Sequence, residues 1–253
     1  MPESEMTGEP AVAGCERAVR VSMPLPYGSF AAAVERRARM FLVAAACLAV
    51  AGSSGVMAQT FTPPLKLAVL GDSLTAGYGL PASAAFPVRL QQALKDKGIA
   101  TEIVNAGVSG DTASGGRDRL DWSIPEGTQA VLVELGANDM LRGVDPKVTR
   151  AALDDIITRL KARGIAVMLC GMYAAPNLGE AYGRTFNSIY PDLAKKHGVP
   201  LYPFFLDGVT QDAAMKLPDG LHPTAAGVDV IVARILPAVE AFLKELPVTS
   251  AVR

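Results

Sequence analysis

The chain is poor in the residues that build disulfide frameworks and metal sites. Its 253 residues include only three cysteines and two histidines. These numbers exclude a disulfide-stapled fold and a His-rich metal site, and they leave few candidates for a catalytic imidazole. Lys and Arg number 24 against 25 Asp and Glu, so the chain lacks the positive excess typical of proteins that bind nucleic acid or anionic membranes. Hydrophobic residues, at 50% of the chain, suffice for one sizeable core, and we expect one main domain.

The N-terminal region has the order of segments that is typical of secretory signal peptides. Residues 1–35 mix Gly, Pro, Ala and scattered charges without a periodic hydrophobic pattern. We therefore expect an N-terminal extension that is disordered or that results from a wrongly assigned translation start. An arginine-rich stretch then precedes the apolar run 40–51, which is followed by small residues up to Ala58. This order predicts a signal peptide over residues 36–58.

Cleavage after Ala58 would release a periplasmic or secreted protein of residues 59–253. Such a chain keeps one cysteine, Cys170, so no intrachain disulfide is possible. The alternative is a retained membrane-anchoring segment, although the apolar run is too short to span a bilayer comfortably. We expect the mature protein to have no stable membrane span and to be a monomer.

After residue 65, short apolar runs alternate with amphipathic stretches, which is the pattern of a parallel sheet with crossover helices. Strands are predicted at 66–70, 101–105, 130–135, 166–170 and 201–205. Helices are predicted at 86–97, 116–122, 146–163, 179–197 and 224–245. Pro237 should kink the last helix. Right-handed crossovers of this length favour an α/β fold, a three-layer α/β/α sandwich with a five-stranded parallel sheet in the order 2-1-3-4-5.

Ser73 directly follows the first predicted strand, in the sequence Gly71-Asp72-Ser73-Leu74. The carboxyl ends of strands line the ligand crevice of open α/β sheets, so a hydroxyl there can meet a substrate. A turn serine or a helix N-cap explains the same residue equally well. The loops downstream must decide between these interpretations.

Two further loops follow predicted strands. The loop after the second strand contains Gly107, and its glycines allow backbone N–H groups to approach a ligand closely. Asp111, in the same loop, is predicted to cap the next helix rather than to act as a catalytic acid. Asn138 follows the third strand, and its amide can donate to an oxyanion without changing charge, or can stabilise the loop in an Asx turn.

The last loop, before the final helix, contains Asp219 and His222 between Pro218 and Pro223. A serine hydroxyl is a poor nucleophile until a base removes its proton, and the imidazole needs a carboxylate to fix its tautomer. Asp219 and His222 can supply both groups. His197 instead precedes a glycine and is interpreted as a basic residue at a helix C-terminus.

Four blocks of the chain, in this order, resemble those of the GDSL or SGNH hydrolase family: Gly71-Asp72-Ser73-Leu74, the Gly107 loop, Gly136-Ala137-Asn138-Asp139 and Asp219-Gly220-Leu221-His222-Pro223. The chain is similar in particular to the bacterial periplasmic thioesterase I, protease I, lysophospholipase and arylesterase group. The resemblance implies Ser73 as nucleophile, His222 as base and Asp219 as its orienter. It also implies an oxyanion hole made by the N–H groups of Ser73 and Gly107 and the side chain of Asn138.

The resemblance therefore implies a serine esterase without a cofactor or metal, acting on small acyl esters, thioesters or lysophospholipids. A carbohydrate acetylesterase of the same superfamily is the alternative enzyme. An exported binding protein without activity would leave the Asp219–His222 pair unexplained. No Gly-x-Ser-x-Gly elbow supports an α/β-hydrolase, and no Gly-x-Gly-x-x-Gly or Walker motif supports a nucleotide-binding module.

Overall fold

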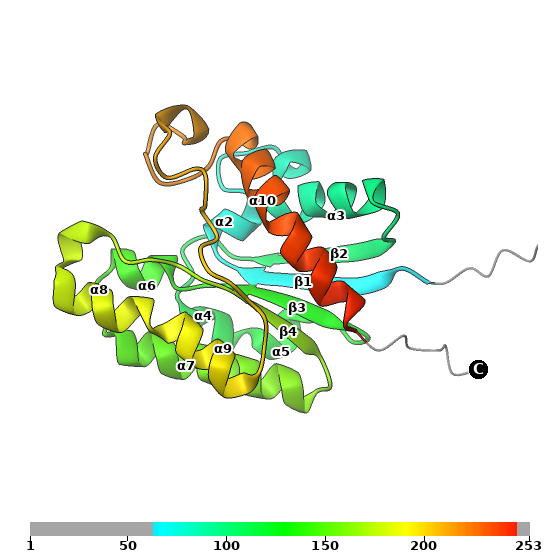
Figure 1. Cartoon of the computed structure of the whole chain (residues 1–253), viewed down its shortest axis with the longest axis horizontal. Helices are drawn as coiled ribbons and strands as arrows, with labels where there is room; N and C mark the ends of the chain where they lie inside the picture. The colour runs from blue at the N-terminus through cyan, green and yellow to red at the C-terminus, as the bar shows by residue number, and fades with distance from the viewer. Residues whose placement is uncertain (1–62, 247–253) are drawn as a thin grey trace, which may run out of the picture. The chain divides into compact units, whose positions relative to one another are not determined.

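The computed structural model describes residues 63–246 (Figure 1). The expected extension 1–35, the signal peptide 36–58 and its cleavage point lie outside the described residues. Within the described part, no helix combines the length and the apolar character needed to cross a bilayer.

One parallel sheet forms the centre of the fold and confirms the predicted strand order. Its strands are β1 (Leu65–Gly71), β2 (Thr101–Gly107), β3 (Ala130–Glu134), β4 (Ala166–Cys170) and β5 (Leu201–Tyr202). The order across the sheet is β2-β1-β3-β4-β5. Because β1 pairs on both sides and helices cover both faces of the sheet, its residues from Leu67 to Leu70 are fully buried and aliphatic.

Helices cover the sheet on both faces, which confirms the three-layer sandwich (Figure 1). On one face, α3 (Phe86–Asp96) packs against α10 (Ala225–Lys244). The other face carries α4 (Ala113–Asp118), α5 (Leu120–Ser123), α7 (Pro146–Ala162) and α9 (Ile189–His197). The shorter helices α2 (Ser73–Ala76), α6 (Ala137–Leu141) and α8 (Glu180–Asn187) follow β1, β3 and β4, and single turns of 3-10 helix lie at Ala82–Ala84, Pro176–Leu178 and Ala213–Met215. The last helix is continuous through Pro237.

The helix predicted over 116–122 is two short helices, α4 and α5, which meet at Arg119. The side chain of Arg119 is buried and donates to Asp111 Oδ2 (2.6 Å) and to the carbonyl of Gly71 (2.9 Å). The prediction that Asp111 caps this helix is wrong. Thr112 is the N-cap and accepts from the N–H of Gly115, and Asp111 is the ion-pair partner of Arg119.

Two other elements differ from prediction because of proline. The helix expected over 179–197 divides into α8 and α9 at Ser188, since Pro191 lacks an N–H and its ring would clash with the carbonyl four residues earlier. The fifth strand ends at Tyr202 instead of residue 205, directly before Pro203, which cannot donate to a neighbouring strand.

Candidate active site

Ser73 lies in the turn between β1 and α2, at the carboxyl end of the central strand. Asp72 is the N-cap of α2, and its Oδ1 accepts from the N–H of Leu74 (2.9 Å). The capping role considered for Ser73 therefore belongs to Asp72. The hydroxyl of Ser73 is left to bond elsewhere.

The hydroxyl bonds to the loop before α10, 149 residues further along the chain. His222 Nε2 lies 2.9 Å from Ser73 Oγ, and His222 Nδ1 lies 2.7 Å from Asp219 Oδ2. The structure thus brings the three residues singled out in the sequence into one hydrogen-bonded chain. This is the arrangement in which a base activates a hydroxyl and a carboxylate orients the base.

The Asp219–His222 loop holds its own carboxylate ionised. Asp219 Oδ1 accepts from the backbone N–H groups of Leu221 (2.8 Å) and His222 (3.0 Å). These hydrogen bonds, that from His222 first, lower the pKa of Asp219 to about 2. Tyr78, which follows α2, packs on the imidazole with ring centroids 4.5 Å apart. The imidazole is therefore held by hydrogen bonds at its two nitrogens and by one aromatic ring.

Asn138, at the start of α6, faces the nucleophile turn. Its Nδ2 donates to Asp72 Oδ2 (3.1 Å) and to the carbonyl of Asp111 (3.0 Å). The amide therefore links three loops that follow β1, β2 and β3. A fixed orientation of this kind is what an oxyanion donor needs, because reorientation during a reaction would cost free energy.

Gly107, the predicted backbone donor, already has an acceptor. Its N–H donates to Asn105 Oδ1 at 3.0 Å. A Cβ at this position would lie 2.4 Å from the N atom of Ala76, so glycine is required here for close packing of β2 against α2. In this arrangement the N–H of Gly107 is not available to an oxyanion.

Three residues further on, Gly110 has the properties expected of a donor. Its φ is +87°, its carbonyl accepts from Arg142 Nη2 (2.7 Å), and its neighbour Asp111 is bound by Asn138. Among the described residues, neither the N–H of Gly110 nor that of Ser73 has an acceptor. Gly110 was overlooked in the sequence, where it stands in the same glycine-containing loop as Gly107.

An apolar cavity of about 420 Å³ adjoins this site. It reaches the Asp219–His222 loop at Gly220 and Leu221, and it reaches α6, which carries Asn138, at Met140 and Leu141. Its remaining apolar side chains include Met172, Tyr173, Phe204, Leu206 and Val209. A largely apolar hollow next to a few converging polar groups is typical of a small-molecule site.

Two further residues that could carry chemistry, His197 and Cys170, have contacts typical of structural residues. His197 is the last residue of α9, before Gly198 in the left-handed conformation, as predicted, and its Nε2 lies 2.5 Å from Asp154 Oδ1. Cys170 is buried, and burial raises the pKa of its thiol far above the usual value. In residues 63–246, no group of three or more His, Cys, Asp or Glu side chains is arranged to hold a metal ion.

The sequence model of the GDSL-like lipase/acylhydrolase family matches residues 69–230, which is more than half of the chain. The chain belongs to this family. It is therefore an ester hydrolase, and the matched range includes all three members of the hydrogen-bonded chain from Ser73 to Asp219.

Individual relatives agree with this membership. An arylesterase of Vibrio mimicus is 42% identical over 159 residues, which cover 62% of this chain and 80% of the relative. The thioesterase 1/protease 1/lysophospholipase L1 of Escherichia coli K12 is 42% identical over 158 residues, 62% of this chain and 74% of the relative. The crystal structure of TesA, 35% identical, superposes with a TM-score of 0.67 over 70% of this chain and 99% of TesA.

Proposed function

We propose that the protein hydrolyses acyl esters with Ser73 as nucleophile, His222 as general base and Asp219 as the carboxylate that orients it. The observation that carries this proposal is the continuous chain of hydrogen bonds at 2.9 Å and 2.7 Å between the three side chains. His222 Nε2 takes the proton of Ser73 Oγ as the oxygen attacks the acyl carbon, and the new C–O bond gives a tetrahedral intermediate. His222 then protonates the leaving oxygen or sulfur.

The acyl-enzyme is cleaved by the reverse sequence of proton transfers. A water loses a proton to His222 Nε2 and attacks the acyl carbon, and the imidazolium returns that proton to Ser73 Oγ as the carboxylic acid leaves. The ionised Asp219 stabilises the imidazolium in both half-reactions. Apart from the acyl group and this water, the three side chains suffice for the balance of protons.

The oxyanion hole in this proposal consists of the N–H groups of Ser73 and Gly110 and the Nδ2 of Asn138. Gly110 replaces Gly107, whose N–H is bonded to Asn105. Both hydrogens of the Asn138 amide have acceptors before substrate binds, so the oxyanion must share one of them or displace its acceptor. Donors aimed at the developing negative charge act mainly in the transition state.

We propose small acyl esters, acyl thioesters and lysophospholipids as the substrate class, with the acyl chain in the apolar cavity. The lining of that cavity by Met140, Met172 and Phe204 suits a hydrocarbon chain better than the sugar of a carbohydrate acetylesterase. The relatives named arylesterase and thioesterase 1/lysophospholipase L1 support this class.

A substrate panel tests the proposal. Aryl esters of increasing acyl length, acyl thioesters, a lysophospholipid and an acetylated sugar are compared under one condition, with the Ser73→Ala variant as the blank. We expect hydrolysis of the first three classes and KM values that fall as the acyl chain lengthens. Preference for the acetylated sugar would contradict the substrate class. Equal activity in the blank would contradict the nucleophile.

We also propose that the protein is exported and acts as a monomer of residues 59–253. The arginine-rich, apolar and small-residue order of residues 36–58 supports export. Mass spectrometry of the periplasmic or secreted fraction should find an N-terminus near Gln59. Recovery of only the full-length chain from the cytosol would contradict export.

A further inference from the structure

Glu134, the last residue of β3, lies buried beneath the nucleophile turn, and its two carboxyl oxygens have unlike surroundings. Oε2 accepts from Thr75 Oγ1 (2.8 Å) and from the backbone N–H of Asp72 (3.4 Å). Oε1 is inaccessible to solvent and has no hydrogen-bond partner among the described residues. Glu134 as a whole is 1% exposed.

So few donors around a buried side chain favour a carboxylic acid over a carboxylate. An ionised carboxylate shares its charge between both oxygens, and each buried oxygen then needs donors. The neutral acid also leaves its unpartnered oxygen with a desolvation cost, but this cost is far smaller than that of an unpaired buried charge. We propose that Glu134 is protonated and acts as a positioning residue for the Ser73 turn, so that the buried Asp72–Glu134 pair carries one negative charge, on Asp72. The positioning part of this inference rests on the proposed role of Ser73.

The charges around the pair agree with a single negative charge. Burial raises the pKa of Glu134 well above its usual value, and the charge of Asp72 raises it further. Burial raises the pKa of Asp72 only to about 6, because Leu74 N–H and Asn138 Nδ2 donate to it. Within residues 63–246 no cation pairs with either carboxyl, since the nearby Arg119 donates to Asp111 and to the carbonyl of Gly71.

The remaining titratable groups near the pair add no positive charge except at the active site. Cys170 lies beside Glu134 in the β3–β4 register. Tyr190 from α9 donates to the carbonyl of Leu135 (2.9 Å). The negative charge of Asp139, in α6, raises the pKa of Asp72, and a positive charge on His222 lowers it. A second buried anion at Glu134 would therefore have no counter-charge of its own.

The position of the acid explains how it acts on Ser73. Its two donors, Asp72 N–H and Thr75 Oγ1, stand on either side of Ser73 in the chain. A Cβ at Gly71 would lie 2.0 Å from Thr75 Oγ1 and 2.7 Å from Glu134 Oε2, so the glycine of the motif is required by this packing. Asp72 in turn holds the amide of Asn138. Glu134 thereby supports the nucleophile and the oxyanion side together.

Two variants separate the acceptor from the charge. Glu134→Gln keeps a carbonyl oxygen for Asp72 N–H and Thr75 Oγ1 and replaces the hydroxyl by a neutral amide, so kcat should stay within about twofold of wild type. Glu134→Leu removes the acceptor, and misplacement of Ser73 should lower kcat about 10²-fold with little change in KM. Rates are expressed per active site titrated with an organophosphate, so that loss of folded protein alone does not count. A fall in Glu134→Gln as large as that in Glu134→Leu would overturn the proposal.

Infrared spectroscopy tests the proton directly and needs no activity. At a pH well above the Asp72 pKa of about 6, the wild-type protein should show the C=O stretching band of a buried protonated carboxyl. The band should be absent from Glu134→Gln and present in Ser73→Ala. Absence from wild type, or persistence in Glu134→Gln, would overturn the proposal even if Glu134→Leu does not fold. An active Ser73→Ala variant would instead refute the proposed nucleophile and leave the band as an independent result.

Discussion

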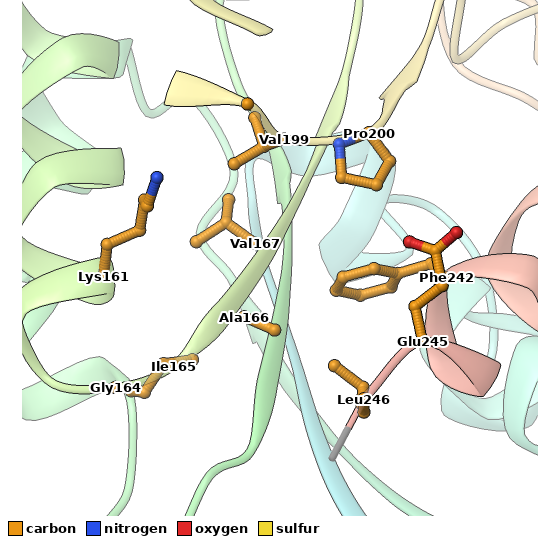
Figure 2. Close-up of a pocket in the computed structure, with 11 residues that line it drawn as sticks. Lys161, Gly164, Ile165, Ala166, Val167, Val199, Pro200, Phe242, Glu245 and Leu246 are labelled. Atoms are coloured by element: carbon orange, nitrogen blue, oxygen red, sulfur yellow. The ribbon is translucent and has the colours of Figure 1, made fainter. Parts of the chain in front are cut away.

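The two ends of the parallel sheet carry hollows of similar size but of different chemistry. At the amino ends of the strands, a hollow of about 370 Å³ is lined by Val167, Val199 and Phe242 together with Lys161 and Glu245 (Figure 2). At the carboxyl ends, the cavity of about 420 Å³ is lined by Gly220 and Leu221, which lie between Asp219 and His222 in the chain. Volume therefore does not distinguish these two hollows.

Convergence of polar groups does distinguish them. The charged side chains of the amino-end hollow come from α7 and from the end of α10, and Lys161 Nζ donates to the carbonyl of His197. At the carboxyl end, loops that follow three different strands meet at Asn138, and a fourth loop brings His222 to Ser73. Parallel strands all end at the same edge of the sheet, which is why this edge can gather a nucleophile, a base and donors.

The largest expected effect comes from breaking the hydrogen-bonded chain at the carboxyl end. Ser73→Ala and His222→Ala should each lower kcat by about 10⁴-fold or more without loss of folding, and the double variant should be hardly worse, because the members of a triad act as a unit. Steady-state kinetics and circular dichroism check this. Multiplicative losses in the double variant would contradict a shared mechanism.

A smaller loss should follow removal of one oxyanion donor. Asn138→Ala should lower kcat by about 10²-fold, with a smaller effect on KM, because the donor acts mainly in the transition state. Loss of the amide also removes its bonds to Asp72 and Asp111, so thermal unfolding is measured alongside. A variant impaired only in substrate binding would place Asn138 outside the oxyanion hole.

The buried Asp72 should make stability depend on pH. Its pKa is raised from 3.8 to about 6, so the native state holds this proton more tightly than the unfolded state does. Its contribution to the free energy of unfolding is therefore greatest below the unfolded pKa and falls as pH rises through about 4 to 6, by about 2 to 3 kcal/mol. Urea unfolding of wild type and Asp72→Asn across this window should show the variant gaining relative stability as pH rises. A constant difference would contradict a raised pKa.

The smallest effect is expected at the amino end. Lys161→Ala and Glu245→Ala alter the hollow of Figure 2, yet kcat/KM should stay within about twofold of wild type because surface changes of this kind have small effects. The same substrates and conditions are used as for the carboxyl-end variants. A loss comparable to that of Asn138→Ala would remove the functional contrast between the two ends.

The sheet and the meeting of Ser73, His222 and Asp219 were predictable because their signals are local. Aliphatic runs such as Leu67 to Leu70 end in polar loops, and parallel topology alone places those loops at one edge. Asp219 and His222 share one short turn, so one loop orients both. The structure places their side chains beside Ser73, as the loop order indicated.

Individual side-chain contacts were not predictable in the same way. The acceptor that occupies the N–H of Gly107 is the side chain of Asn105, and which glycine of a loop keeps a free N–H depends on how the whole loop folds. Arg119 ends α4 because of partners 8 and 48 residues away in the chain. Glu134 is the one charged residue of an apolar strand, and its surroundings depend on Asp72 and Thr75, which precede it by 62 and 59 residues.

Covalent labelling of the nucleophile tests the account most directly. An organophosphate should inactivate the protein at one equivalent, and peptide mapping by mass spectrometry should place a single adduct on the peptide that contains Ser73. Iodoacetamide should leave most of the activity, because Cys170 is buried and its thiol pKa is raised. Inactivation with the adduct on any other residue, or without an adduct on Ser73, would contradict the proposed mechanism.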